Sequence, residues 1–568
     1  MYIIPNPQKI TLEQESFSYS GSLLTCDDEK IKSFADFNLP LFFNKIESDK
    51  AEFYSIISAK DGVYIKYGDI EGAYRACATL DQIVAQCGDT FPKIEIEDWP
   101  AIKNRGYMLD ISRGKIPNIE ELYKLIDRMS ALKYNQLQLY LDSFPVAYKN
   151  YPEYTKDTEP LTLNELIELN EYAKAHFVKL VPNQNTFGHM KAWTQKPEIA
   201  PLAITGKDGE PSQTLNPLNP KTIDFIDSVF DGYIDIFDSD IVNVGMDETV
   251  DLGKNETKEE CDKLGVGKVY TNYLNKICDL VSTKYHMTPM FWDDIIFKHP
   301  EELDNIPKNA IVGQWGYEQE HQYDRNCRRI SERGLRFYVC PGTSMWGSFT
   351  GRTDNAVFNI WNAAECGAYY GAEGFLLTEW GDDGFPQFTS TSYFPFVFGG
   401  AVSWNILNHS NEFAYDPRNK LIDECKEYLN DFLYDAHGTD FAEIVYRMGN
   451  YYLLDRELHF NGTKLYHYTM NPDQIPEGKA SCYGEIAAYM TSLREKLAKI
   501  DADPQAKEEI LLNCDMVIAL ASVIANGKSD YTDFEISRIQ KEYKTLWLKS
   551  NHEKGVELFI NILEKAKR

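Results

Sequence analysis

Long apolar runs and clusters of basic residues are both missing from this sequence of 568 residues. No run of about 18 apolar residues occurs, so we expect no membrane-spanning helix and no membrane partner. Lysine and arginine total 58 against 87 aspartate and glutamate residues, which gives a formal net charge of -29. Because nucleic acids bind to concentrated positive charge, this balance argues against a nucleic-acid partner and favours a neutral substrate.

Paired cysteines are also missing. The eleven cysteines show no C-x-x-C spacing and no cysteine–histidine cluster of the zinc type. An odd set of isolated cysteines is typical of reduced core thiols, which favours a reducing compartment. The N-terminal MYIIPNPQKITLEQ lacks the basic segment and apolar run of a secretion signal. We expect a cytoplasmic protein, or a secreted one if a leader has been removed, without metal or cofactor.

Eight short strand-like segments, each followed by a helical pattern, fill the middle of the chain. They lie at 105–111, 136–141, 178–183, 241–246, 288–292, 310–315, 335–340 and 374–378. Residues Thr162 and Glu165 form a capping box at the start of one intervening helix. This alternation predicts a (β/α)8 TIM barrel over residues 101–411, with the active site at the C-terminal ends of the strands.

The two ends of the chain have different patterns. Residues 1–100 combine short strands with a helix over 72–87, which predicts a small α+β domain. Residues 412–568 carry long apolar stripes over 481–500, 508–525 and 534–566, which predict a C-terminal α-helical domain. These helices could cover the side of the barrel or form a homodimer surface.

The stretch IVNVGMDE, 241–248, runs from apolar residues directly into Asp247 and Glu248. Adjacent side chains on a strand point to opposite faces, so the two carboxylates can converge on one ligand only where the strand ends. An isolated Asp-Glu pair is more often the first turn of a helix. Support for a site therefore has to come from the other strand ends.

Polar residues and tryptophans gather at those ends. They are Asp110 with Arg113, Asp142, the segment 183–189, Asp247 with Glu248, Trp292 with Asp293, Trp315, Trp346, and Trp380 with Asp382. A single tryptophan is usually a core or rim filler. Tryptophan faces together with carboxylates suit a sugar, whose C–H faces stack on rings and whose hydroxyls need hydrogen-bond acceptors.

Three segments resemble the conserved blocks of glycoside hydrolase family 20, the β-N-acetylhexosaminidases: IEDWPAIKNRGYMLDISRG (95–114), GMDE (245–248) and LLTEWGDDG (376–384). The helical tail makes the chain similar to the bacterial exo-β-N-acetylglucosaminidase branch. The resemblance implies removal of a terminal β-linked GlcNAc, or GalNAc, from a carbohydrate with retention at C1. The choice between the two sugars stays open.

By this resemblance, Glu248 is expected to be the general acid, and Asp247 to orient the 2-acetamido group. The acetamido oxygen then attacks C1 and gives an oxazolinium intermediate, so that no protein nucleophile is needed. The neighbouring carboxylate and the tryptophan walls should raise the pKa of Glu248, while Asp247 stays ionised.

The resemblance also assigns substrate-binding residues. Arg105 is expected to grip the 3- and 4-hydroxyls, although a structural salt bridge is an equally good interpretation. Asp382 should accept from the 4- or 6-hydroxyl, and Asp142 stands where the family has acids after the second strand. The remaining candidates are His189, the tryptophans Trp292, Trp315 and Trp380 around the sugar, and Trp346 or Tyr338 as donor to the acetamido carbonyl.

Three other functions fit parts of the pattern. A metal-dependent barrel hydrolase could use Asp247, Glu248, His189, Asp293 and Asp294, but the sequence has ten histidines and no paired histidine spacing. A retaining glycosidase with a carboxylate nucleophile needs carboxyls from two different strands about 5 Å apart. A sugar-binding barrel without turnover would not need the intact Asp-Glu pair.

Overall fold

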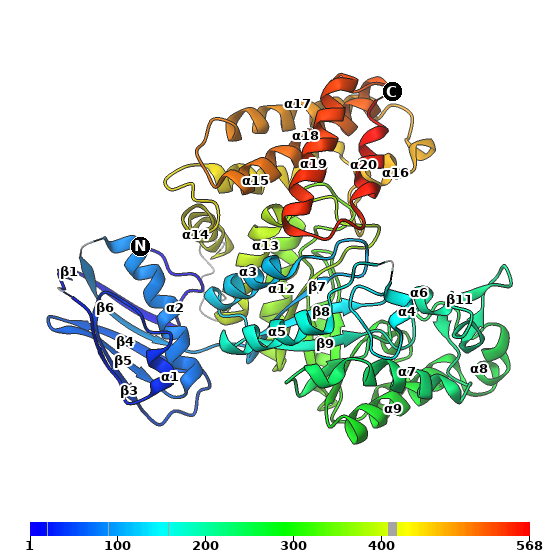
Figure 1. Ribbon diagram of the computed structural model, residues 1–568, viewed down its shortest axis with the longest axis horizontal. Coiled ribbons are helices and arrows are strands. Elements are labelled where there is room, and N and C mark those ends of the chain that lie inside the picture. The colour runs from blue at the N-terminus through cyan, green and yellow to red at the C-terminus, as the bar shows by residue number, and fades with distance from the viewer. Residues whose placement is uncertain (20, 89, 157, 407–416, 568) are drawn as a thin grey trace.

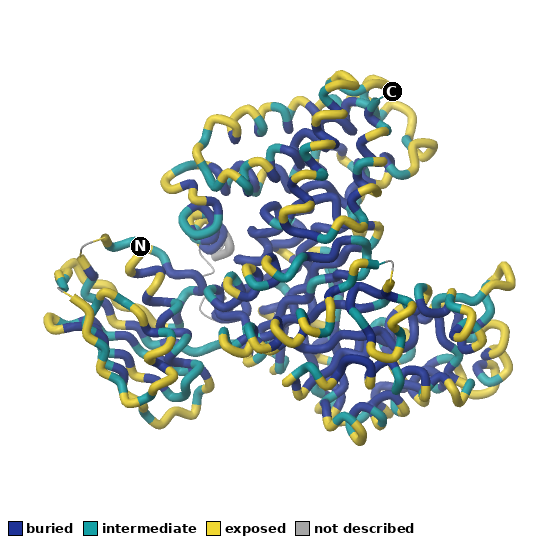
Figure 2. The backbone as a smooth tube through the Cα atoms, viewed as in Figure 1, coloured by how far each residue is buried: buried dark blue, intermediate teal, exposed yellow. Residues whose placement is uncertain are grey.

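The structure is a computed structural model that describes residues 1–568 except 20, 89, 157, 407–416 and 568. Figure 1 shows an N-terminal sheet with its helices on one side of a central barrel, and a set of C-terminal helices packed on another side. Figure 2 shows that buried residues run through the barrel and into the C-terminal helices. The N-terminal domain has its own apolar core, separate from this larger one.

The N-terminal domain is a six-stranded sheet in the order β1-β6-β4-β5-β3-β2. In β4 (Tyr54–Ala59), alternate residues are buried, as expected for a strand with one covered face. Helix α2 (Ile70–Cys87) covers that face and starts at Asp69, whose carboxylate accepts from the Gly72 N–H. The other elements are β1 (Lys9–Phe17), β2 (Leu23–Thr25), α1 (Glu29–Lys32), β3 (Pro40–Lys45), β5 (Gly62–Tyr67) and β6 (Phe91–Asp98).

A closed parallel barrel forms the centre, in the order β12-β13-β14-β15-β16-β7-β8-β9. The prediction of a (β/α)8 barrel is therefore confirmed. Its strands are β7 (Asn104–Asp110), β8 (Gln136–Leu141), β9 (Lys179–Gln184), β12 (Ile241–Asn243), β13 (Thr288–Trp292), β14 (Ile311–Trp315), β15 (Arg336–Cys340) and β16 (Gly374–Glu379). Strand β12 ends at Asn243 instead of the predicted 246, because the backbone takes positive φ angles at Gly245 and Met246.

Helices surround the barrel and close each strand–helix unit. They are α3 (Ile119–Ala131), α4 (Pro152–Thr155), α5 (Leu163–Ala175), α6 (Lys191–Thr194), α7 (Lys221–Asp231), α8 (Lys258–Leu264), α9 (Val266–Lys284), α10 (Asp294–Lys298), α11 (Tyr323–Ser331), α12 (Thr353–Tyr370) and α13 (Tyr393–Trp404). The predicted capping box of Thr162 and Glu165 is present at the start of α5. A small hairpin, β10 (Ala203–Thr205) and β11 (Pro211–Leu215), follows α6.

The C-terminal part is helical, as predicted. It contains α14 (Pro417–Phe432), α15 (Phe441–Met448), α16 (Lys464–Met470), α17 (Ala480–Leu497), α18 (Pro504–Asn526), α19 (Asp533–Ser550) and α20 (Val556–Glu564). The prediction of one helix over 534–566 is wrong, because the chain leaves helical geometry at Asn551, which has extended backbone angles. The predicted domain boundary at 411/412 lies outside the described residues. No helix in the described part of the chain is both long and apolar enough to cross a bilayer.

Short 3-10 helices lie in several connections. They are Ala200–Leu202, Ile234–Ile236, Asn255–Thr257, Pro300–Asn305, Thr389–Ser392, Tyr451–Asp455 (η6) and Pro472–Gln474. Of these, η6 is important for the site, because the segment that follows it reaches the barrel.

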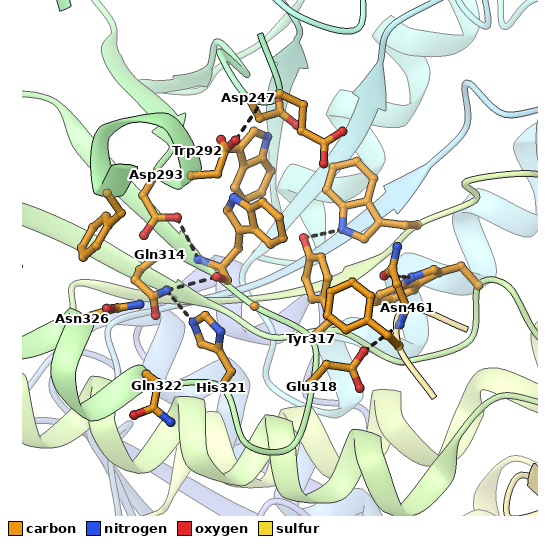
Figure 3. Close-up of a pocket in the computed structure, with 18 of the residues that line it drawn as sticks. Asp247, Trp292, Asp293, Gln314, Tyr317, Glu318, His321, Gln322, Asn326 and Asn461 are labelled. Carbon is orange, nitrogen blue, oxygen red and sulfur yellow. Dashed lines mark hydrogen bonds between the residues drawn. The ribbon is translucent and has the colours of Figure 1, made fainter. Parts of the chain in front are cut away.

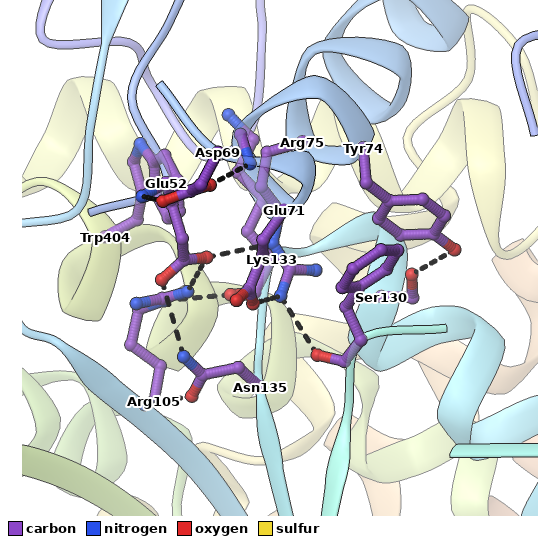
Figure 4. Close-up of polar contacts among 12 residues, drawn as sticks. Glu52, Asp69, Glu71, Tyr74, Arg75, Arg105, Ser130, Lys133, Asn135 and Trp404 are labelled. Carbon is purple, nitrogen blue, oxygen red and sulfur yellow. Dashed lines mark hydrogen bonds and ion pairs between the residues drawn. The ribbon is translucent and has the colours of Figure 1, made fainter. Parts of the chain in front are cut away.

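A buried ion cluster joins the N-terminal domain to the bottom of the barrel (Figure 4). The Glu52 carboxylate lies between Arg75 and Arg105, with N–O distances of 3.0 and 2.6 Å. The Arg105 guanidinium also donates to the carbonyls of Lys133, at 2.8 Å, and Ile102, at 2.9 Å. Both arginines are fully buried, so each needs this carboxylate close by.

The expected contact of Arg105 with a sugar is therefore wrong, and the structural salt bridge is what forms. Arg105 is the second residue of β7, whereas the active-site end of that strand is Asp110. At about 3.3 Å per residue, the two positions are about 17 Å apart. The side chain points into the domain interface and has no path to the upper rim.

We predict that Arg105→Ala destabilises the protein by about 3–5 kcal/mol, because it leaves Glu52 buried beside one cation instead of two. A matched control is Arg336→Ala, which breaks a partly exposed pair with Glu373 and should cost about 1 kcal/mol or less. Urea or thermal denaturation measures both. Equal losses of stability in the two variants would contradict the interpretation.

Candidate active site

A cavity of about 690 Å³ opens at the C-terminal end of the barrel strands (Figure 3). Its position agrees with the rule that barrel active sites are built from the loops after the strands. The side chains around it include Arg113, His189, Asp247, Glu248, Trp292, Trp315, Tyr317, Trp346, Trp380, Asp382 and Asn461. Of the catalytic and sugar-binding residues expected from the resemblance, all line this cavity except Arg105, Asp142 and Tyr338.

The backbone after β12 brings the two adjacent carboxylates to the same side. The chain leaves the extended conformation at Gly245 and Met246, and Glu248 itself has a φ of 46°. Residues other than glycine rarely adopt this region, and such outliers cluster at functional sites. The neighbouring loop approaches so closely that a Cβ on Gly188 would lie 2.0 Å from the Asp247 carbonyl oxygen. Only glycine fits there.

His189 lies between the two carboxylates. Its Nε2 is 3.4 Å from Asp247 Oδ2 and 3.3 Å from Glu248 Oε2. The other oxygen of Asp247, Oδ1, accepts from the Asn185 amide at 2.8 Å. The side chains of Asp247 and Glu248 therefore converge on one point, which is what a shared ligand requires.

These contacts set the charges of the group. Burial disfavours the imidazolium, but Asp247 and Glu248 outweigh it and raise the pKa of His189 to about 10. Burial also opposes ionisation of Asp247, yet the charge of His189 and its hydrogen bonds hold the pKa of Asp247 below its usual value. At neutral pH the cluster holds one cation and ionised carboxylates.

The expected rise in the pKa of Glu248 is wrong for this structure. The hydrogen bond from His189 is the largest influence, and it lowers the pKa of Glu248 despite partial burial and the charge of Asp247. The Glu248 side chain is also 50% exposed, so desolvation is weaker than the tryptophan-lined cavity suggested. The sequence placed the two acids together but could not show that a cation lies between them.

Several aromatic rings line the cavity. The Trp292 and Trp380 rings are 5.9 Å apart and inclined at 59°, and Trp315 stacks on Tyr317 at 5.0 Å. The Trp380 indole N–H donates to the Tyr317 hydroxyl at 2.6 Å. Because this hydroxyl accepts from Trp380, it can donate its own proton either to Thr378, which also bonds to it, or to a ligand in the cavity. Burial raises the pKa of Tyr317 well above its ordinary value, so it keeps that proton.

Tyr317 is better placed to donate a hydrogen bond to a ligand in the cavity than Trp346 or Tyr338, the two donors expected from the sequence. The Trp346 indole N–H is already bonded to Asn461 Oδ1 at 2.7 Å. Tyr338 is buried inside the barrel, where its hydroxyl pairs with Gln136, and it does not line the cavity. Tyr317 lies two residues past the end of β14, so the strand-end rule could have identified it.

Arg113, which follows β7, and Arg325, from α11, are arginines that line the cavity. Asp110, the last residue of β7, binds the Arg113 guanidinium and accepts from the Gly381 N–H at 2.9 Å. Asp142 lies behind Arg113, with an N–O distance of 3.2 Å, and holds that side chain instead of facing the cavity. Asp382 does line the cavity, one residue after Gly381.

The described residues offer no ligand set for a metal. No group of three or more histidine, cysteine, aspartate or glutamate side chains among them is arranged to hold an ion. Asp293 and Asp294, which the metal-dependent alternative requires, have other partners: the Asp293 carboxylate accepts from the Trp315 N–H at 3.4 Å, and Asp294 from the Glu248 N–H at 3.3 Å.

Known proteins match the chain over the N-terminal sheet and most of the barrel. The model of the glycosyl hydrolase family 20 catalytic domain matches residues 103–364, and the model of domain 2 of the same family matches 35–99. The beta-hexosaminidase of Emericella nidulans is 26% identical over 319 residues, which are 51% of this chain and 52% of that protein. The chain thus spans about half the length of the curated relatives it matches.

Solved structures show the same fold at low identity. The chitobiase of Flavobacterium johnsoniae superposes with a TM-score of 0.62 at 17% identity, covering 99% of both chains. The exo beta-N-acetylglucosaminidase of Vibrio harveyi, solved with N-acetylglucosamine, has a TM-score of 0.58 at 16% identity and covers 75% of this chain and 77% of that chain. With the two family models together matching more than half of the sequence, the chain belongs to glycoside hydrolase family 20.

Proposed function

We propose that the protein is an exo-acting β-N-acetylhexosaminidase that removes terminal β-linked GlcNAc from carbohydrates with retention at C1. The observation that carries the proposal is the convergence of Asp247 and Glu248 in a cavity walled by tryptophans. Relatives named beta-hexosaminidase and the structures solved with GlcNAc support this substrate class. The barrel fold places these residues but does not by itself imply a function, which depends on the chemistry of the site.

The geometry supports substrate-assisted hydrolysis. Glu248 gives its proton to the glycosidic oxygen as the bond from that oxygen to C1 breaks, and the acetamido carbonyl oxygen forms a new bond to C1. Ionised Asp247 stabilises the positive charge that spreads onto the acetamido nitrogen. Water then attacks C1 and reopens the ring, while the Glu248 carboxylate accepts the proton from that water.

The aromatic residues assist at the acetamido group. Trp292, Trp315 and Trp380 provide apolar faces for its methyl and for the sugar ring, and Tyr317 donates its hydroxyl proton to the carbonyl oxygen. Holding that oxygen against C1 makes an intramolecular attack possible, which removes most of the entropic cost of bringing a nucleophile to the carbon.

His189 sets the pH at which this chemistry runs. Glu248 must be protonated to act as an acid, but the hydrogen bond from His189 favours its carboxylate form. The protein should therefore work best on the acid side of neutrality, where a larger fraction of Glu248 carries its proton and Asp247 is still ionised.

The proposal also includes a location in the cell and an alternative function. We place the protein in the cytoplasm, a choice supported by its eleven unpaired cysteines, which suit a reducing compartment. A sugar-binding protein without turnover remains the alternative function, and hydrolysis of an aryl β-GlcNAc separates the two.

Glu248→Gln should lower kcat on an aryl β-GlcNAc by about a hundredfold or more with little change in KM, because the amide cannot supply a proton. The matched control is Glu259→Gln on the exposed surface of α8, which should keep wild-type turnover. An aryl β-glucoside, which lacks the acetamido group, should not be hydrolysed. Unchanged turnover in Glu248→Gln, or rapid glucoside hydrolysis, would refute the mechanism.

His189→Ala should move the pH profile of kcat/KM to higher pH. Removing the cation raises the pKa of Glu248, so its acid form persists to higher pH, and it raises the pKa of Asp247, so that group ionises later. Both limbs of the profile therefore shift in the same direction. As a control, replacing the exposed His437 between α14 and α15 by alanine should leave both limbs in place. A profile for His189→Ala that matches the wild type would show that His189 does not set these charges.

Tyr317→Phe should reduce kcat/KM on the aryl β-GlcNAc by roughly tenfold, because one hydrogen bond to the developing charge on the acetamido group is lost. Tyr369→Phe, an exposed tyrosine on α12, serves as the control. If Tyr317→Phe retains full activity, the donor is another group.

A further inference from the structure

The C-terminal part of the chain contributes two side chains to the cavity. Asn461, which Figure 3 shows at the cavity, and Phe460 both lie in the segment that follows η6 and line the cavity. They lie outside the residues matched by either family model. We propose that Asn461 is a sugar-binding residue that acts with Asp382 to read the hydroxyls of the bound hexosamine farthest from the scissile bond. This inference rests on the proposed function of the site.

Barrel loops hold the segment firmly against the cavity. The Thr463 N–H donates to the Gly347 carbonyl at 2.7 Å. Gly462 packs so closely on that loop that an added Cβ would lie 2.9 Å from the same oxygen. On the other side, the Asn461 backbone N–H donates to Glu318 Oε1 at 2.8 Å. The position of Asn461 is therefore fixed by contacts that do not involve its side chain.

The orientation of the Asn461 amide follows from its partners. The Trp346 indole N–H can only donate, so the atom 2.7 Å from it must be the amide oxygen. The amide nitrogen, Nδ2, then faces Asp382 Oδ2 at 3.3 Å. No other assignment of the amide oxygen and nitrogen satisfies both neighbours.

This arrangement leaves groups free for a ligand. Nδ2 has two hydrogens, and the bond to Asp382 uses one. Asn461 is exposed, with a φ of 51°, so its side chain is presented to the cavity at some backbone cost. An N–H donor beside a carboxylate acceptor suits a sugar hydroxyl, because the hydroxyl can donate to the carboxylate and accept from the N–H. The direction of a sugar hydroxyl decides whether both bonds form.

The position of Asp382 in the barrel indicates which hydroxyls these are. Asp382 follows β16, next to the β7 end that carries Arg113, whereas Glu248 follows β12. In the closed barrel, three strands, β13 to β15, separate β12 from β16 on one side. A sugar with C1 at Glu248 therefore presents its C4 end toward Asp382 and Asn461. The 4-hydroxyl is the group by which GlcNAc and GalNAc differ.

Phe460 adds an apolar face at the rim. Its ring is 82% exposed although it lines the cavity. An exposed ring beside a polar pair is the combination that binds sugars, through stacking on C–H faces. Phe460 should therefore contribute to affinity without distinguishing the two epimers.

The test compares aryl β-GlcNAc and aryl β-GalNAc on the full-length protein. Asn461→Ala removes both side-chain bonds, and Asn461→Asp keeps the shape and the acceptor for Trp346 but places a second carboxylate beside Asp382. Both variants keep the backbone bond to Glu318. We expect the KM for the preferred epimer to rise about tenfold with a smaller change in kcat, and the ratio of kcat/KM between epimers to fall about tenfold.

Matched controls separate binding from structure. Asn471→Ala changes an exposed asparagine at the end of α16, and Phe534→Ala removes an exposed ring on α19, which is the counterpart of Phe460→Ala. Both controls should behave as wild type, whereas Phe460→Ala should raise KM severalfold for both epimers alike. Thermal denaturation of every variant shows whether it is folded.

Two results would overturn the inference. One is a wild-type epimer ratio and KM in both Asn461 variants. The other is an equal loss for the two epimers, which would make Asn461 a structural residue. If the wild-type protein hydrolyses neither glycoside, the proposed function fails instead. Binding of GlcNAc, followed by tryptophan fluorescence, then tests Asn461: weaker binding in Asn461→Ala but not in Asn471→Ala supports the inference, and equal binding overturns it.

Discussion

The imidazolium of His189, held between two neighbouring carboxylates, is the interaction on which the site depends. Adjacent residues on a strand diverge, so Asp247 and Glu248 can meet only because β12 stops early and the backbone adopts positive φ angles at Gly245, Met246 and Glu248. The cation then makes their proximity favourable, since two carboxylates alone would repel each other. Its charge also fixes which protonation states the pair can adopt, and so links the backbone geometry to the pH at which the proposed chemistry proceeds.

The two ends of the barrel have different tasks. At the lower end, Glu52 and its two arginines join the N-terminal sheet to the start of β7, and this buried cluster has no contact with the cavity. At the upper end, Asp110 connects β7 to the residues after β16 by accepting from Gly381 and binding Arg113. The closure of the barrel between its first and last strands thus positions one arginine and one carboxylate of the site. Stability and function are separated along the length of a single strand.

Much of the fold could be predicted from the sequence, because the signals are local. The eight apolar strand segments and the capping box of α5 each depend on a few neighbouring residues, and all of them are present in the structure. Most site residues could also be predicted, since a barrel collects whatever follows its strands at one end. The wrong predictions concern residues whose role depends on their position in the folded barrel. Arg105 was preferred to Arg113, although a strand places them at opposite ends, and Tyr338 was considered in place of Tyr317.

The sequence by itself determined the order of strands and helices, the family, and the pair of acids at the end of β12, because these depend on residue type and spacing. The tertiary structure alone decided the charge of that pair, since His189 is brought to it from the loop after β9, 58 residues before Asp247 in the chain. It also decided that Asn461, from the segment between η6 and α16, lies beside Asp382 at the cavity. Interactions between side chains far apart in the chain have no local pattern, so only the folded packing shows which groups meet and what each does to the pKa of the other.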